Sequence, residues 1–365
     1  MAFSALDHQH MARALQLAEL GLTTTSPNPR VGCVIAHGDT VVGEGWHRRA
    51  GEAHAEVHAL RAAGSRAEGA TAYVTLEPCA HHGRTPPCAD ALIAARVARV
   101  VIAMGDPNPL VAGQGIARLN HAGIAAEYGL LGAQAQELNL GFVSRMTRNR
   151  PWVRLKAAST LDGKTALNNG VSQWITGSAA RADGHRWRAR ACAILTGIGT
   201  VKADDPQLTV RDVPCERQPL RVLVDARFDI SPDARLFNGD PVLIVTARPD
   251  ADKAAMLAAR NAHTVNLPNP QGKVDLPALL EHLAQRGINE LHVEAGFKLN
   301  GSLLREGCVD ELLLYTAPML VGDAAQGLFN LAELTDLQQA RPLVWHDVRQ
   351  VGKDMRFVGR FQPAG

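Results

Sequence analysis

Little in this chain favours binding to a membrane or to nucleic acid. Its 365 residues carry a net charge of only +2 and 4% aromatic side chains, so neither a basic surface nor a row of base-stacking platforms is expected. No stretch approaches the roughly 18 continuous apolar residues of a membrane span. The N-terminus lacks a basic patch followed by an apolar run, so no signal peptide is expected. We therefore expect a cytoplasmic location.

Cysteines are also few. Six are scattered over the chain, which argues against a disulfide framework and for a reducing compartment. The apolar fraction of 46% and the charged fraction of 20% are typical of a globular protein. The length is sufficient for two domains of ordinary size.

One histidine and two of these cysteines form a candidate zinc site. His54, Cys79 and Cys88 supply three ligands and leave a fourth corner for water, as in catalytic rather than structural zinc sites. Glu56 is expected to transfer protons without binding the metal, because zinc lowers the pKa of its water. Zinc nucleobase deaminases have the same residue types in this order, with two residues between the cysteines. Here the second cysteine lies nine positions after the first.

The same residues also have simpler interpretations. His54 and His58 are four apart and could share a helix face without binding metal. Cys79 and Cys88 could be two unrelated buried thiols. The predicted local structure favours the metal site, because a strand is expected to end just before Cys79 and a helix to begin near Cys88. A helix N-terminus stabilises a thiolate ligand.

Two successive series of helices and strands divide the chain. Residues 1–147 alternate between the two and predict a three-layer α/β/α sandwich, whose last helix is expected over residues 132–146. The polar, proline-containing stretch 147–151 is the expected linker. A new series begins at Trp152, and we expect a second α/β domain over residues 151–365.

The chemistry of the second half is less explicit. Glycine-containing turns at 195–200 and 294–302 each follow an expected strand and precede a helix. Backbone N–H groups at such turns can bind phosphate, but neither turn has the Gly-x-Gly-x-x-Gly pattern and both could be plain connections. Arg188 and Arg211 could bind an anionic substrate or be solvated.

With these residues in view, the chain resembles the bifunctional deaminase/reductase family of riboflavin biosynthesis over essentially its whole length. The first half carries PNPRVG at 27–32, GEAHAE at 51–56, TLEPCAHHGRTPPC at 75–88 and DPNP at 106–109. The second half carries LDGK at 161–164, SQWIT at 172–176, TVKADDPQLTVR at 200–211 and VEAG at 293–296. The wide spacing of the two cysteines is this family's own variant.

The resemblance implies a cytidine-deaminase-like domain followed by a dihydrofolate-reductase-like domain. It implies zinc-dependent hydrolytic deamination of 2,5-diamino-6-ribosylamino-4(3H)-pyrimidinone 5′-phosphate. NADPH reduction of the ribosyl group to ribityl then gives 5-amino-6-ribitylamino-uracil 5′-phosphate. The expected partner is this phosphorylated pyrimidine, with no nucleic acid or membrane, in a homo-oligomer that is a dimer or a tetramer.

The resemblance also implies which residues contact the ligands. The cofactor is expected at Ala158, Trp174, Thr200, Asp204, Ala226, Gly296, Phe297, Lys298, Leu299, Asn300, Gly301 and Ser302. The substrate of the reductase is expected at Ser172, Arg188, Leu208, Arg211 and Glu294. The substrate of the deaminase is expected at Asn28, His47, Asp106 and Asn108.

Two positions depart from the family pattern. Ala80 stands where a serine is common beside the zinc cysteine, and Ala157-Ala158 replaces a pair that often contains glycine. Two other functions stay open on the sequence: a nucleic-acid deaminase with an appended binding domain, and a non-catalytic protein with a structural zinc. No single arginine is assigned to a 2′-phosphate, so the residues alone do not select NADPH over NADH.

Overall fold

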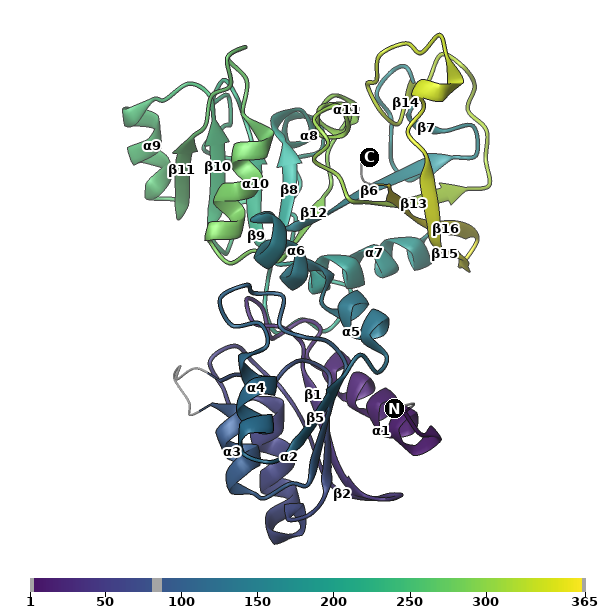
Figure 1. Ribbon diagram of the computed structural model, residues 1–365. Coiled ribbons are helices and arrows are strands. Elements are labelled where there is room, and N and C mark those ends of the chain that lie inside the picture. Colours follow the sequence, from purple (N-terminus) through teal and green to yellow (C-terminus); the bar gives the residue numbers. More distant parts are fainter. Residues whose placement is uncertain (1–2, 81–86, 363–365) are drawn as a thin grey trace. The chain divides into compact units, whose positions relative to one another are not determined.

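The computed structural model describes residues 3–80 and 87–362, so residues 81–86 of the motif at 75–88 lie outside the described residues. The chain forms two compact units, Met1–Asn149 and Arg150–Gly365 (Figure 1). Within the described residues, none of the helices is both long enough and apolar enough to span a membrane.

The first unit is built on a five-stranded sheet with the order β2-β1-β3-β4-β5. β1 is antiparallel to both of its neighbours, whereas β3, β4 and β5 are parallel. The strands are β1 Gly32–His37, β2 Thr40–Trp46, β3 Thr71–Val74, β4 Arg99–Ile102 and β5 Ala125–Tyr128. The helices are α1 Ala5–Glu19, α2 Ala55–Ala63, η1 Gly64–Ala67, α3 Cys88–Ala94, α4 Gln114–His121, α5 Gly132–Leu138 and α6 Leu140–Arg148.

Helices cover both faces of this sheet. Because side chains alternate along a strand, Ile35 of β1 packs in one core with Ala59 of α2. The next residue back, Val34, packs in a second core with Met11 of α1. These two cores on opposite faces make the three-layer sandwich, and the prediction of an α/β/α unit is confirmed.

The predicted single helix over residues 132–146 is wrong. Two helices, α5 and α6, meet at Asn139, whose backbone leaves the helical region at φ −112° and ψ 20°. The side chain of Asn139 accepts a hydrogen bond from the Arg30 N–H at 2.8 Å and donates one to the Arg30 carbonyl at 3.0 Å. The helical sequence pattern continues through Asn139, but this tertiary contact with Arg30 interrupts the helix there.

The second unit contains a nine-stranded sheet with the order β11-β10-β9-β8-β12-β6-β13-β16-β15. The strands from β11 to β13 are parallel, and β16 and β15 extend the sheet as antiparallel strands. The strands are β6 Trp152–Thr160, β8 Ala193–Gly197, β9 Leu220–Val224, β10 Val242–Thr246, β11 Ala262–Asn266, β12 Glu290–Val293, β13 Glu311–Ala317, β15 Leu343–Val351 and β16 Asp354–Phe361. A separate pair joins β7 Lys164–Ala166 and β14 Gln326–Gly327.

Helices lie on both faces of the large sheet as well. They are α7 Ser178–Arg190, α8 Ile198–Asp204, η2 Arg235–Phe237, α9 Ala251–Ala258, α10 Leu276–Gln285, α11 Phe297–Arg305 and η3 Leu337–Gln339. Leu195 of β8 packs in one core with Leu279 of α10, and the adjacent Ile194 packs in another with Leu257 of α9. The second α/β unit of the prediction is thus confirmed. The carboxyl ends of β8, β12 and β6 meet at one edge of the sheet, where sites of such folds lie.

Candidate functional site

The three predicted zinc ligands come together in the first unit. His54 Nδ1 lies 3.2 Å from Cys88 Sγ and 3.7 Å from Cys79 Sγ, and the three ligand atoms all lie within 4.8 Å of one another. A tetrahedral zinc with bonds of about 2.0 Å to nitrogen and 2.3 Å to sulfur separates these two atom types by about 3.5 Å. The donor set therefore fits zinc with one corner left for water.

Local structure explains why these residues meet. His54 is the N-cap of α2 and Cys88 is the first residue of α3, so both ligands sit at helix N-termini. Cys79 follows the end of β3, and its sulfur accepts a hydrogen bond from the Cys88 N–H at 3.3 Å. Gly45 of β2 allows α2 to begin close to the sheet, because a Cβ there would lie 2.5 Å from the Ala55 carbonyl.

The cluster favours the thiolate form of Cys79. A hydrogen bond from the Cys88 thiol, together with His54, lowers the pKa of Cys79. The same hydrogen bond and burial raise the pKa of Cys88, so the two sulfurs share a proton. The contact with Cys79 also raises the pKa of His54. Metal binding displaces such protons, because zinc takes deprotonated ligands.

Glu56 lies in the first turn of α2 and is only 3% exposed. Burial raises its pKa, although His54 opposes the rise, and its carboxylate interacts with the Cys88 thiol. Cys33 of β1 is fully buried close to Glu56, and burial and that carboxylate raise the pKa of the Cys33 thiol. A buried carboxyl with a raised pKa beside the metal ligands is suited to proton transfer.

Asn28 and His47 lie next to the zinc ligands. The His47 ring lies 5.4 Å from the ring of His54 and perpendicular to it. Burial lowers the pKa of His47, which favours the neutral ring. Its Nδ1–H donates to the Ala53 carbonyl at 3.1 Å, which leaves Nε2 to accept from the Asn28 amide at 3.1 Å.

Asp106 and Asn108 occupy the loop that follows β4. The Asp106 carboxylate accepts from the Asn108 N–H at 2.8 Å, and the Asn108 side chain accepts from the Leu110 N–H at 3.1 Å. Both residues are partly exposed. The loop is therefore ordered by its own side chains and presents polar groups at its surface.

In the second unit, two strand-to-helix turns lie side by side. β8 leads into α8 and the neighbouring strand β12 leads into α11. Leu299 covers Gly197, where a Cβ would lie 2.9 Å from its side chain, and Thr200 Oγ1 lies 3.5 Å from the position of a Cβ on Gly296. The fold thus joins Thr200 to Gly296, and two helix N-termini offer N–H groups to a phosphate. Asp204 is exposed at the end of α8.

The remaining residues of the 296–302 segment are engaged within the unit. Asn300 is buried and donates to the Ala295 carbonyl at 3.0 Å. Gly301 packs on the backbone of Asn330, and Ser302 donates to the Lys298 carbonyl at 3.2 Å. Contacts from this part of the segment to a cofactor remain predictions.

Arg188 and Glu294 form a closely held ion pair at the end of β12. Arg188 Nε and Nη2 donate to the two Glu294 carboxylate oxygens at 2.5 and 2.8 Å, and Nη1 donates to the Thr209 carbonyl at 2.9 Å. Burial opposes ionisation of Glu294, but Arg188 and His292 outweigh it and hold its pKa well below the usual value. Glu294 is therefore a carboxylate.

Lys156 belongs to this cluster, although the sequence analysis missed it. Leu155 of β6 pairs with Val293 of β12, so Lys156 and Glu294 are level on neighbouring strands. Burial lowers the pKa of Lys156. The negative charge of Glu294 raises this pKa, and the positive charge of Arg188 lowers it further. The available signal was a lysine in an otherwise largely apolar strand, which alone does not reveal its partner.

Leu208 and Arg211 differ in what they can offer a ligand. The Leu208 side chain is 3% exposed in the core beneath α8, and its φ of 53° is left-handed. The Arg211 N–H donates to His185 at 3.3 Å, and its guanidinium donates to Thr209 Oγ1 at 3.0 Å. Because Arg211 is exposed, most of its donors stay open to solvent or to an anion.

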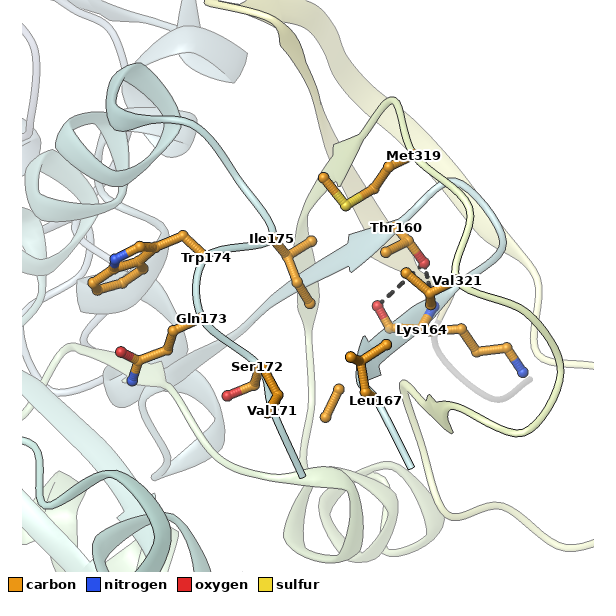
Figure 2. Close-up of a pocket in the computed structure, with 11 residues that line it drawn as sticks. Thr160, Lys164, Leu167, Val171, Ser172, Gln173, Trp174, Ile175, Met319 and Val321 are labelled. Carbon is orange, nitrogen blue, oxygen red and sulfur yellow. Dashed lines mark hydrogen bonds between the residues drawn. The ribbon is translucent and has the colours of Figure 1, made fainter. Parts of the chain in front are cut away.

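Ser172 and Trp174 line a cavity beyond the end of β6. Figure 2 shows Val171 to Ile175 along one side and Met319 and Val321 along another. Trp174 is 68% exposed, and the Arg181 guanidinium lies 4.5 Å from the centre of its ring. The cavity has a volume of about 150 Å³, below the roughly 300 Å³ of complete ligand pockets. It can therefore hold only part of a cofactor or substrate.

Ala158 and Ala226 mark two other strand ends at this edge. Ala158 lies near the end of β6 and pairs with Tyr315 of β13. Ala226 follows β9, and its carbonyl accepts from the Ala247 N–H at 3.1 Å. Both residues were expected to contact the cofactor, and those contacts remain predictions.

Comparisons with known proteins cover both units. The family model for the cytidine and deoxycytidylate deaminase zinc-binding region matches residues 4–104, and that for the RibD C-terminal domain matches residues 151–355. The riboflavin biosynthesis protein RibD of Escherichia coli is 48% identical over 96% of this chain and 98% of its own length. That of Haemophilus influenzae is 45% identical over 100% of both chains.

Solved structures of RibD proteins are also similar to this chain over almost its whole length. Acinetobacter baumannii RibD, form 1, is 44% identical and has a TM-score of 0.90, with 98% of this chain and 99% of that chain covered. The Thermotoga maritima diaminohydroxyphosphoribosylaminopyrimidine deaminase/5-amino-6-(5-phosphoribosylamino)uracil reductase is 32% identical and has a TM-score of 0.88, with the same coverage.

These matches confirm the predicted fold classes, both enzymatic activities and the zinc and NADPH cofactors, and they do not favour a nucleic-acid deaminase. The chain belongs to the RibD family of riboflavin biosynthesis, as a bifunctional zinc-dependent deaminase and NADPH-dependent reductase.

Proposed function

We propose that residues 1–147 deaminate 2,5-diamino-6-ribosylamino-4(3H)-pyrimidinone 5′-phosphate and that residues 151–365 reduce the product. In the first step water replaces the amino group, which leaves as ammonia. In the second, NADPH would supply a hydride to the ribosyl C1′, and a proton goes to the ring oxygen. The C1′–O bond breaks, and 5-amino-6-ribitylamino-uracil 5′-phosphate results.

For deamination, His54, Cys79 and Cys88 hold the zinc. The metal supplies a Lewis acid that lowers the pKa of the attacking water. Glu56 accepts a proton from that water and passes it to the departing amino group, a role that its buried position and raised pKa support. The single observation that carries this assignment is the three-ligand cluster next to a buried carboxyl.

Four further residues face the deaminase substrate in this proposal. His47 orients the side-chain amide of Asn28 by accepting a hydrogen bond from its nitrogen. The side-chain oxygen of Asn28 is then left to accept a hydrogen bond from the pyrimidine. Asp106 and Asn108 contact the substrate from the loop after β4. The T-shaped contact of His47 with His54 supports this assignment, because it places the His47–Asn28 pair beside a metal ligand.

For reduction, the helix N-termini at Thr200 and Gly296 would hold the cofactor phosphates, and the cofactor would supply a hydride. Ala158 and Trp174 would also contact the cofactor, together with Asp204, Ala226, Phe297, Lys298, Leu299, Asn300, Gly301 and Ser302. The adjacency of the two turns supports this placement.

The reductase substrate binds at the carboxyl ends of β6 and β12. Lys156 donates the proton to the ribosyl ring oxygen, and the negative charge of Glu294 on the neighbouring strand favours the protonated ammonium of Lys156. Arg211 binds the substrate phosphate with its open guanidinium. Ser172, Arg188 and Leu208 complete the substrate contacts. The register of the two strands supports this grouping.

The protein is proposed to act as a homo-oligomer, a dimer or a tetramer. β15 forms an edge of the large sheet and exposes Val344, Trp345 and Val348 by 52, 55 and 47%. Exposed apolar edge strands pair readily with another chain, and a second copy presents the same edge. Nucleic acid is not a proposed partner. A cytoplasmic location is proposed because both zinc cysteines must stay reduced.

One coupled assay tests the sequence of reactions. Supplied with the diaminopyrimidine substrate and NADPH, the full chain should release ammonia and oxidise NADPH in equal amounts, with ammonia first. Removal of zinc by a chelator should stop both when this substrate is used, but should leave NADPH oxidation intact when the deaminated intermediate is supplied. Oxidation of NADPH without ammonia release would contradict the proposal.

A further inference from the structure

The Glu77 carboxylate binds four backbone N–H groups of one segment. Its Oε2 accepts from Asp106 at 3.1 Å and from Gly113 at 3.0 Å. Its Oε1 accepts from Gly115 at 2.9 Å and from Ile116 at 3.2 Å. The side chain is only 5% exposed. One oxygen atom thus joins the two ends of the loop at residues 106–113, and the other holds the start of α4.

Helix α4 depends on this carboxylate. Its N-cap is Gly113, which has no side chain to accept from the free N–H groups of the first turn. Glu77 lies two residues before Cys79, and it satisfies those groups from outside the helix. Its negative charge is also favourable at a helix N-terminus. The 106–113 loop and the metal-ligand segment are therefore joined through a single side chain.

Further contacts fix α4 against both cysteine segments. Gly115 packs so closely on Pro78 that a Cβ would lie 2.0 Å from the Pro78 carbonyl. Arg118 donates to the Ala80 carbonyl at 3.0 Å and to Asp90 of α3 at 2.8 Å. The base of the loop is thus held rigidly, whereas the segment between Asp106 and Gly113 is ordered by hydrogen bonds among its own residues.

We propose that Glu77 is a positioning residue of the deaminase, which closes the 106–113 loop so that Asp106 and Asn108 face the pyrimidine. The inference rests on the proposed function of these two residues. A carboxylate is required because both oxygens must accept: a glutamine would turn an N–H₂ group towards two N–H donors. Glu77 acts through the loop, and not on the metal or on the reacting atoms.

The test compares Glu77→Gln with the matched control Glu68→Gln in the full chain. Glu68 is in the same unit, but its carboxylate is exposed and pairs with Arg96 at 2.7 Å. Glu77→Gln should raise the KM of ammonia release by at least about 10-fold, because hydrogen bonds to a charged group are lost. Zinc content and reductase turnover should stay unchanged, and amide exchange should speed up in peptides covering residues 105–116. Glu68→Gln should change none of these.

Two outcomes overturn the proposal. An unchanged KM means that the loop does not need Glu77, and loss of zinc means that Glu77 serves the metal site instead. If Glu77→Gln does not fold, Glu77→Asp decides, because its carboxylate keeps the charge but falls short of part of the segment. The same rise in KM with zinc retained is expected, and an unchanged KM refutes the inference.

Asn108→Ala tests the proposed substrate contact of Asn108 separately from the role of Glu77. If Asn108→Ala leaves KM unchanged, the substrate role of Asn108 is wrong whatever Glu77 does. If both single variants raise KM, the double variant should raise it by less than the product of the two, since both act through the same loop. A full product of the two effects would show that Glu77 does not act through Asn108.

Discussion

Arg188 and Glu294 are joined by two hydrogen bonds, from Nε to Oε1 at 2.5 Å and from Nη2 to Oε2 at 2.8 Å. The side chains are 15 and 16% exposed, so the pair is largely shielded from water. The third contact of Arg188, to the Thr209 carbonyl, ties α7 to the segment that carries Arg211. Arg188 thus has a structural role in addition to the proposed contact with substrate.

The two arginines should therefore respond differently to alanine. Arg188→Ala leaves Glu294 buried without its main partner, and we expect the reductase unit to lose about 3 kcal/mol of unfolding free energy. Arg211→Ala should leave stability unchanged and raise the KM for the deaminated intermediate by roughly 10- to 100-fold, as expected for a lost charge-assisted hydrogen bond. Calorimetry and steady-state kinetics on both variants measure this difference. Equal stability losses would contradict it, as would an unchanged KM in Arg211→Ala.

Acid should weaken this unit through Glu294. Its folded pKa is held well below the usual value by Arg188, after burial has been overcome. A carboxyl with a depressed folded pKa adds stability above its unfolded pKa of about 4.3, and that stability is lost as the pH falls through the folded value. Glu294→Gln should therefore show a shallower fall of unfolding free energy below pH ~4.3. A slope equal to that of the unsubstituted chain would show that other carboxyls dominate.

Reductase activity should fall in alkali because of Lys156. As a proton donor it must be protonated, and burial lowers its pKa from the usual 10.5. The rate of NADPH oxidation with supplied intermediate should therefore decline as the pH rises, with a midpoint below 10.5. In Lys156→Arg the rate should fall at every pH, since a guanidinium stays charged and does not give up its proton, and the residual rate should lack this decline. An alkaline decline that persists in Lys156→Arg would assign the proton to another group.

Two buried cysteines offer a matched test of the metal site. Cys88 and Cys33 are both fully buried in the first unit, but only Cys88 lies in the ligand cluster. Cys88→Ser should lose most of its zinc and its ammonia release, whereas Cys33→Ser should keep both. Metal analysis of the purified variants decides this. Loss of zinc from Cys33→Ser alone would place the metal elsewhere.

Much of the zinc site could be predicted because its chemistry is local. Ligand types, their order and the neighbouring glutamate identify His54, Cys79, Cys88 and Glu56 without a fold. The reductase cluster depends on strand register instead. Lys156 lies near Glu294 only because β6 and β12 pair in parallel. The sequences of the two short strands do not indicate that they are neighbours.

The errors in the fold have the same origin. The helical pattern continues through Asn139, and only the hydrogen bonds to Arg30, far away in the sequence, end the helix there. β11 was not predicted, because Ala262–Asn266 is a short edge strand with a mixed polar sequence. Glu77 was read as part of a motif, and its four N–H partners lie 29 to 39 residues further along the chain.

The central claim is that one chain carries two separate sites, with Glu56 serving deamination alone. The most direct test is Glu56→Gln in the full chain, followed by zinc content, ammonia release and NADPH oxidation on supplied intermediate. We predict about one zinc per chain, a loss of ammonia release by at least ~10²-fold and unchanged NADPH oxidation, since general acid–base catalysis contributes that much. Loss of zinc would make Glu56 a ligand, and loss of NADPH oxidation would show that the two activities share a site.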